Sequence, residues 1–289
     1  MDRIAFLRRR LRLGMRIIEM GPSHRPIVPK AEGWATTVVD CTDRPGLLKK
    51  FAGQPVEAER IEDVDILWQG GDLAAAFPKT QHGRFDAIIA SHVMEHMPDP
   101  IGFLSAAQTL LRPSGIIVLA LPDKRYTFDF FGPLTSTGDW LTAYHTQART
   151  HSRRAGYNHV AYHVTNDDRI TWNYAERLRN LRFSYSLEDG LAHFNANTDD
   201  GDGNDYIDYH AWRFTPSSFM LLMLESCALT DIDWRVLECT PPADYEFFAV
   251  IGRGRVRLDN EALNAARLDL LTATMREMQQ GNSLLDARL

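Results

Sequence analysis

The chain has 289 residues, of which 44% are hydrophobic and 24% are charged, and its formal net charge at pH 7 is −6. This length suits one large domain or one domain with a sizeable insertion, and the apolar content excludes a disordered chain. The negative charge argues against a general nucleic-acid binder, because such proteins are usually basic. We therefore expect a globular protein with no nucleic-acid partner.

Compartment and membrane signals are sparse. The three cysteines are widely spaced, which excludes a disulfide scaffold and provides no CxxC zinc signature. No run of about 18 apolar residues occurs, so we expect no membrane span. The N-terminus lacks the apolar core and the cleavage site of a signal peptide. A reducing cytoplasm is the expected compartment.

The first 14 residues are rich in arginine and carry apolar residues at helical spacing. We expect a basic helix over residues 1–14 that lies on the edge of the domain with solvated arginines. The alternative is a surface for a polyanion or an anionic membrane. The apolar stripe is short, which favours the first interpretation.

From residue 15 onward, short apolar runs alternate with segments of helical length. Continuous apolar strands in this rhythm are typical of a parallel sheet covered on both faces. Asp99 and Pro100 open one of the helices, and a Pro-Ser-Gly turn at residues 113–115 is expected to end it. The five expected strands are residues 16–20, 35–40, 64–68, 85–90 and 116–121.

Residues 123–210 break this rhythm and are rich in aromatic residues, His, Asp and Asn. So long an irregular stretch is typical of a lid, binding loops or a small helical subdomain.

After a helix that Thr215 caps, the runs 231–238 and 246–251 are joined by a link too short for a crossover helix, so they should pair antiparallel. We expect a core of residues 15–122 and 211–258, an acceptor-binding insertion over residues 123–210, and a C-terminal helix within residues 259–289. That helix packs on its own domain or on a second subunit of a homodimer.

Residues that directly follow the expected strands are the candidates for ligand binding, because open α/β sheets bind ligands at the carboxyl ends of their strands. An acid at the end of the second strand can accept hydrogen bonds from both hydroxyls of a ribose. A glycine after the first strand lets a ligand approach the backbone. The candidates are Glu19, Gly21, Asp40, Gly71, Asp72, Leu73, Ser91, His92 and Asp123.

Five short motifs lie at residues 18–23, 38–40, 70–73, 85–96 and 110–115. In order and spacing they resemble the motifs of class I S-adenosylmethionine-dependent methyltransferases of the type 11-like, small-molecule branch. The resemblance covers residues 15–125 and, more loosely, 210–252. It implies a doubly wound, Rossmann-like α/β fold with a seven-stranded sheet of order 3-2-1-4-5-7-6, whose seventh strand is antiparallel. It also implies S-adenosylmethionine as the cofactor, bound by the candidates from Glu19 to His92. The first motif departs from the family's E-x-G-x-G-x-G, because only Glu19 and Gly21 remain.

Methyl transfer to a hydroxyl needs in-line positioning and a base for the released proton. His96, which begins the helix after the fourth strand, is the first candidate for this base, and Asp123 is the second. The other interpretation of His96 is a helix-start residue bonded to backbone. His159 and His163 share a helix face, but no glutamate stands between them, so we expect no catalytic zinc motif and no metal.

The acceptor is expected to lie between the end of the fifth strand and the end of the insertion. The candidates for binding it are Lys124, Arg125, Tyr126, His210 and Trp212. The alternative for Lys124 and Arg125 is solvated loop charges with Tyr126 packed beneath them.

The expected function is methyl transfer from S-adenosylmethionine to an oxygen or nitrogen of a small, hydroxylated, sugar-like acceptor. One alternative is a methyltransferase-like binding protein without activity, which the reduced first motif favours. The other is an NAD-dependent oxidoreductase, which would need G-x-G-x-x-G where this chain has only Gly21.

Overall fold

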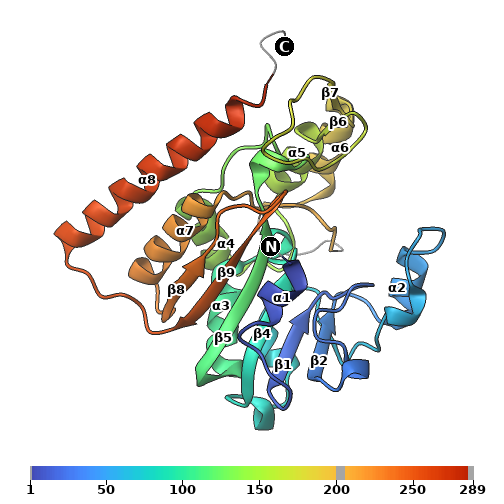
Figure 1. Cartoon of the computed structure of the whole chain (residues 1–289), viewed down its shortest axis with the longest axis vertical. Helices are drawn as coiled ribbons and strands as arrows, with labels where there is room; N and C mark the ends of the chain where they lie inside the picture. The colour runs from blue at the N-terminus through green and yellow to red at the C-terminus, as the bar shows by residue number, and fades with distance from the viewer. Residues whose placement is uncertain (1, 200–205, 286–289) are drawn as a thin grey trace.

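The expected strands form one seven-stranded sheet at the centre of the molecule (Figure 1). The computed structural model describes residues 2–199 and 206–285. The order β3-β2-β1-β4-β5-β9-β8 confirms the expected topology, with β1 to β5 parallel and β9 antiparallel to both of its neighbours. The strands are β1 (Arg16–Met20), β2 (Ala35–Asp40), β3 (Ile66–Leu67), β4 (Phe85–Ser91), β5 (Leu111–Pro122), β8 (Trp234–Cys239) and β9 (Glu246–Arg253).

Both faces of the sheet are buried, because successive strand residues point to opposite sides. Ile18 of β1 lies in the larger core cluster, with residues of α3 (Pro100–Leu110), α4 (Thr137–His145) and α7 (Pro216–Leu229). Its neighbour Ile17 lies in a smaller cluster on the other face, with Phe6 and Leu7 of α1 (Arg3–Arg8). The helix α2 (Arg44–Lys50) follows β2. The parallel strands are therefore continuous apolar runs, as the sequence predicts.

Two element boundaries differ from expectation. The strand β5 begins at Leu111, directly after α3, so residues 113–115 lie within the strand instead of forming a turn before it. A register shift between Phe85 and Ala87 of β4 takes up the extra residues of β5. The edge strand β3 is only two residues long, because few residues of the run 64–68 pair with β2.

The insertion is more regular than the sequence suggests. It holds α4, α5 (Arg153–Ala161) and α6 (Leu187–Ala196), and a pair of antiparallel strands, β6 (Val164–Asn166) and β7 (Leu181–Phe183). In Figure 1, α5, α6 and the β6–β7 pair gather above the end of the sheet at which the parallel strands finish. Residues 200–205 of the insertion lie outside the described part of the chain.

Helices near both ends of the chain pack on this same domain. The helix α1 is shorter than expected, and four arginines of the basic segment 1–14 form ion pairs within the molecule, which favours the domain-edge interpretation. The pairs are Arg3–Glu246, Arg8–Glu32, Arg9–Glu238 and Arg10–Glu238. The long helix α8 (Asn260–Asn282) runs beside α7, where Glu277 accepts hydrogen bonds from Ser217 (Figure 1). Within the described residues, no helix has the length and apolar character needed to span a membrane.

Candidate functional site

A cavity, here called the strand-end cavity, lies where β1, β2, β3 and β4 finish. Four of the residues expected to bind the cofactor or act in catalysis line it: Gly21, Asp40, His92 and His96. Tyr206 and Asp208, from the end of the insertion, also line it. The fold therefore brings part of the predicted site together and adds a wall from a segment far along the chain.

Asp40 is the acid that the sequence places at the end of the second strand. Its Oδ1 accepts a hydrogen bond from the Cys41 amide at 2.8 Å, whereas its Oδ2 is buried and has no hydrogen-bond partner among residues 2–199 and 206–285. Burial raises the pKa of this carboxyl, although the amide of Cys41 opposes the shift. A buried acceptor usually has a hydrogen-bond donor. A ligand with hydroxyl groups in this cavity could supply that donor to Oδ2 of Asp40.

Gly21 ends β1 and adopts a left-handed backbone conformation, with φ of +55°. A Cβ atom at this position would lie 3.0 Å from Cγ2 of Val93, which also lines the cavity. Glycine is therefore required here both by the backbone conformation and by the close approach of Val93, which follows β4.

Glu19 and Ser91, which the sequence assigns to cofactor binding, have other partners. Glu19 is buried beneath the loop after β1, and its two carboxylate oxygens accept hydrogen bonds from the amides of Ile27 and Val28. Burial raises the pKa of Glu19 to about 7. Ser91 accepts a hydrogen bond from Arg3 of α1. Neither residue lines the strand-end cavity, so Glu19 shapes the loop instead of touching a ligand directly.

The residues after β3 lie in three different places: the strand-end cavity, the groove beside it and the core. Gly70 lines the strand-end cavity, whereas Gly71 and Asp72 line an adjoining groove. Oδ1 of Asp72 accepts a hydrogen bond from the Ala74 amide at 2.9 Å, and Leu73 is fully buried in the core. Leu73 is therefore a packing residue, and Asp72 stands at the rim.

His92 lies directly after β4 in a left-handed conformation that is uncommon for a residue with a side chain, with φ of +53°. Its Nε2 pairs with Glu246 at 2.8 Å, and its Nδ1 lies 3.4 Å from Glu95. Burial lowers the pKa of His92, but the contacts with Glu246 and Glu95 outweigh burial and raise it to about 9. His92 therefore places a positive charge on the cavity wall at neutral pH.

His96 ends the short turn η5 (Met94–His96), and its side chain is 19% exposed, on the wall of the cavity. Its Nδ1 lies 2.9 Å from Oδ1 of Asp208, an ion-pair contact without the alignment of a hydrogen bond. Asp208 also pairs with Lys50 at 3.2 Å, so it ties the insertion to the core across the cavity. Burial lowers the pKa of His96, but Asp208 and Glu95 reverse the shift and raise it.

The residues after β5 that were expected at the acceptor site are all buried. Asp123 is fully buried, and its carboxylate pairs with the guanidinium of Arg125 at 2.6 Å. Lys124 donates a hydrogen bond to the carbonyl of Phe130 at 2.5 Å, and Tyr126 packs in a separate apolar cluster. None of these residues lines the strand-end cavity, and each has a buried partner or packing contact, so their roles in catalysis and acceptor binding stay predictions.

The other two expected acceptor-binding residues lie close to the turn η5. The amides of Ala211 and Trp212 both donate to the carbonyl of Glu95, at 2.9 and 3.2 Å. His210 is buried beside His96, with ring centroids 4.5 Å apart. Trp212 lines a second cavity of about 130 Å³, formed mainly by the insertion, which shares Pro98 with the strand-end cavity.

Several residues of this site carry no sequence signal. Lys50, Tyr206 and Asp208 lie in segments without a motif, and only the fold brings them to the strand ends. Glu95 belongs to a motif that was recognised, but its complete burial and its position between histidines were not foreseen.

Curated proteins with similar sequences are named as ubiquinone biosynthesis O-methyltransferases. One from Xanthomonas campestris pv. campestris is 36% identical over 61 residues, which is 21% of this chain and 21% of that protein. One from Acinetobacter baumannii is 28% identical over 97 residues, or 32% of this chain and 38% of that protein. The matched part is about a fifth of the length of the first relative, so it says nothing of the whole protein's substrate.

Solved structures with a related fold are distant. A Rhodobacter sphaeroides protein described as a Zn-dependent alcohol dehydrogenase has a TM-score of 0.47 and 16% identity, over 88% of this chain and 89% of that one. The 1,6-didemethyltoxoflavin N1-methyltransferase of Burkholderia thailandensis has a TM-score of 0.40 and 13% identity, over 88% of this chain and 76% of that one. Likenesses this remote carry no argument about the reaction.

The family itself follows from a longer match. The family model described as a methyltransferase domain matches residues 1–193, which is more than half of the 289-residue chain. The matched part contains β1 to β5 and the residues from Met20 to Pro98 that line the strand-end cavity. The chain therefore belongs to the methyltransferase-domain family, and its resemblance to class I S-adenosylmethionine-dependent methyltransferases is confirmed.

Proposed function

We propose that this protein transfers a methyl group from S-adenosylmethionine to a small hydroxylated acceptor, at an oxygen or a nitrogen. The observation that carries the proposal is Oδ2 of Asp40, a buried acceptor without a partner on the wall of the strand-end cavity. In this interpretation the two ribose hydroxyls donate to the Asp40 carboxylate. The cofactor backbone then passes Gly21, where a side chain would meet Val93.

The second cavity is the proposed site of the acceptor. It adjoins the strand-end cavity at Pro98, and its lining includes hydroxyl, amide and imidazole groups, among them Thr142, His151 and Asn158. Such groups suit a hydroxylated molecule, because each can donate or accept a hydrogen bond. The names of the curated relatives favour an oxygen as the methylated atom.

His96 stands between the two proposed binding sites and is our candidate for the base. In an in-line transfer the acceptor oxygen bonds to the methyl carbon while the carbon–sulfur bond breaks, and its electron pair stays on sulfur. The hydroxyl proton would pass to the imidazole, which Asp208 holds by its contact with Nδ1. Positioning supplies the rest of the rate enhancement, since the sulfonium carbon is already electrophilic.

Two measurements on the purified chain test this proposal. Calorimetry should show binding of S-adenosylhomocysteine, and methyl-labelled S-adenosylmethionine should transfer label to at least one member of a panel of phenols, sugars and amines. Binding without transfer to any of them would instead favour the binding-protein alternative. Failure to bind S-adenosylhomocysteine, with or without binding of NAD, would overturn the cofactor assignment.

A further inference from the structure

Glu95 is a buried acid that the proposed methyl transfer does not use. Its side chain is fully buried, and neither of its carboxylate oxygens accepts a hydrogen bond from a described residue. A buried carboxylate is costly to hold in its ionised form unless donors or a cation compensate for the lost water. The imidazoles of His92 and His96 lie 3.4 and 3.9 Å from this carboxylate.

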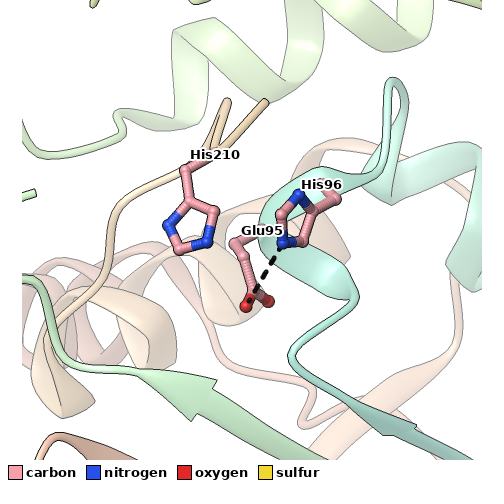
Figure 2. A group of neighbouring side chains, drawn as sticks. All are labelled: Glu95, His96 and His210. Carbon is pink, nitrogen blue, oxygen red and sulfur yellow. Dashed lines mark ion pairs between the residues drawn. The ribbon is translucent and has the colours of Figure 1, made fainter. Parts of the chain in front are cut away.

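A third histidine reaches the same carboxylate from a distant part of the chain. Figure 2 shows the rings of His96 and His210 on either side of Glu95, His96 from the turn η5 and His210 from the end of the insertion. The two rings meet edge to face, with an interplanar angle of 87°. One possible ligand atom from each of Glu95, His96 and His210 lies within 4.8 Å of the other two.

Both histidines have a second carboxylate behind them. Nδ1 of His210 is hydrogen-bonded to Asp129 at 2.6 Å, and Nδ1 of His96 lies 2.9 Å from Asp208. Contacts at Nδ1 leave Nε2 of each ring to face Glu95. Histidines that ligate a metal usually have their other ring nitrogen bonded to a carboxylate or carbonyl, which orients the ring and raises its basicity.

We propose that Glu95, His96 and His210 bind a divalent transition-metal ion, with Zn²⁺ as the best match to the donor set. Two imidazole nitrogens and one carboxylate oxygen are ligands that zinc accepts, at bond lengths of about 2.0–2.2 Å. Tetrahedral bonds of that length hold ligand atoms about 3.4 Å apart, so each of these atoms would move inward by less than about 1 Å. Three protein ligands leave a fourth position for water or a substrate atom.

The binding of the ion stands on its own, but its role rests on the proposed function. His96 lines the strand-end cavity, and Trp212, two residues after His210, lines the second cavity, so the ion would lie between the proposed cofactor and acceptor sites. A bound zinc ion lowers the pKa of an oxygen that coordinates it. Nε2 of His96 cannot both bind the ion and take a proton, so in the metal-bound protein His96 is a ligand. The ion would then lower the pKa of the coordinated acceptor hydroxyl, whose proton would pass to solvent water before the oxygen bonds to the methyl carbon.

Direct metal titration tests the site without any assay of methyl transfer. The full chain is stripped with a chelator, dialysed and titrated with Zn²⁺ by calorimetry, and Co²⁺ absorption reports the ligand geometry. We expect one ion per chain, and at least about 100-fold weaker binding in Glu95→Gln and His210→Ala, since even an outer partner contributes about 10–100-fold. The matched control is His145→Ala, because His145 is exposed on α4 and should leave the affinity unchanged.

Binding of S-adenosylhomocysteine to the same variants separates this proposal from the previous one. Neither Glu95 nor His210 lines the strand-end cavity, so both variants should keep wild-type affinity for it if they are folded. Should His210→Ala fail to fold, His210→Gln retains a polar group toward Asp129. Zinc binding that is equally tight in the wild type and in the folded Glu95→Gln and His210 variants would overturn the site, as would no zinc binding to a wild type that binds S-adenosylhomocysteine.

Discussion

Replacing Asp40 by alanine should weaken the binding of S-adenosylhomocysteine strongly. Oδ1 of Asp40 is already occupied by the Cys41 amide, so Oδ2 is the atom available to the ribose. Hydrogen bonds to charged groups contribute about 1.5–3 kcal/mol each, and the side chain is only 7% exposed, so water screens them little. The dissociation constant should rise by about 10- to 150-fold.

Calorimetry on three variants isolates this effect. Asp40→Asn preserves an acceptor for Cys41 and the shape of the side chain, yet it should also lose affinity because an amide replaces the charged acceptor. Asp63→Ala is the control, since that carboxylate is 92% exposed and does not line the cavity. A change of less than about twofold in the dissociation constant of Asp40→Ala would show that Asp40 does not bind the ribose.

The pH dependence of binding gives a second measure of the same carboxylate. The ionised form of Asp40 accepts the ribose hydrogen bonds, so affinity should fall as the pH decreases and the carboxyl takes up a proton. Burial raises the pKa of Asp40, so this fall should begin at a higher pH than an exposed aspartate would cause. In Asp40→Asn this dependence should be absent.

Three further substitutions test other parts of the account. Glu19→Ala leaves two buried amides of the loop after β1 without an acceptor, so chemical denaturation should show a loss of about 2–4 kcal/mol. Arg125→Met leaves the buried charge of Asp123 unpaired and should cost about 3–5 kcal/mol of stability. If the folded fraction of that variant binds the acceptor much more weakly, Arg125 is not merely structural. We place the adenine of the cofactor beside Asp72, in the groove that adjoins the strand-end cavity. Asp72→Asn should therefore raise the KM for S-adenosylmethionine more than it lowers kcat, because adenine is bound similarly in the ground and transition states. A loss confined to kcat would place Asp72 in the chemistry.

The sheet was predictable because its strands are short apolar runs in which both faces are buried. The ends of those strands follow from the same pattern, which is why Gly21 and Asp40 were correctly expected at one edge. The antiparallel pairing of β8 and β9 followed from the short link between them. These features depend on residues close in sequence, where local patterns are informative.

The insertion was harder to predict, although its helices carry start signals. Serines cap α4, α5 and α6, and two of these caps are completed by an aspartate three residues later, Asp139 and Asp189. The aromatic and polar composition of the segment masks any apolar period, so these signals stand alone. Capping boxes identify where a helix begins but not how it packs.

The burial of the residues after β5 was not predicted, because it depends on contacts with segments far away in the sequence. The amide of Asp123 donates to the carbonyl of Tyr245, and that of Lys124 donates to Phe214, so two distant segments cover this strand end. Arg125 also reaches the carbonyl of Glu277 in α8. A strand end that other segments cover cannot receive a ligand, and local sequence does not reveal such contacts. The cluster of Glu95, His96 and His210 was missed for the same reason.

A crystal structure of the chain with S-adenosylhomocysteine would show directly whether the strand-end cavity binds the cofactor. The account predicts both ribose hydroxyls within hydrogen-bond distance of the Asp40 carboxylate, the cofactor passing Gly21, and the sulfur turned toward His96. A cofactor bound elsewhere, or in the strand-end cavity with its ribose away from Asp40, would contradict the account.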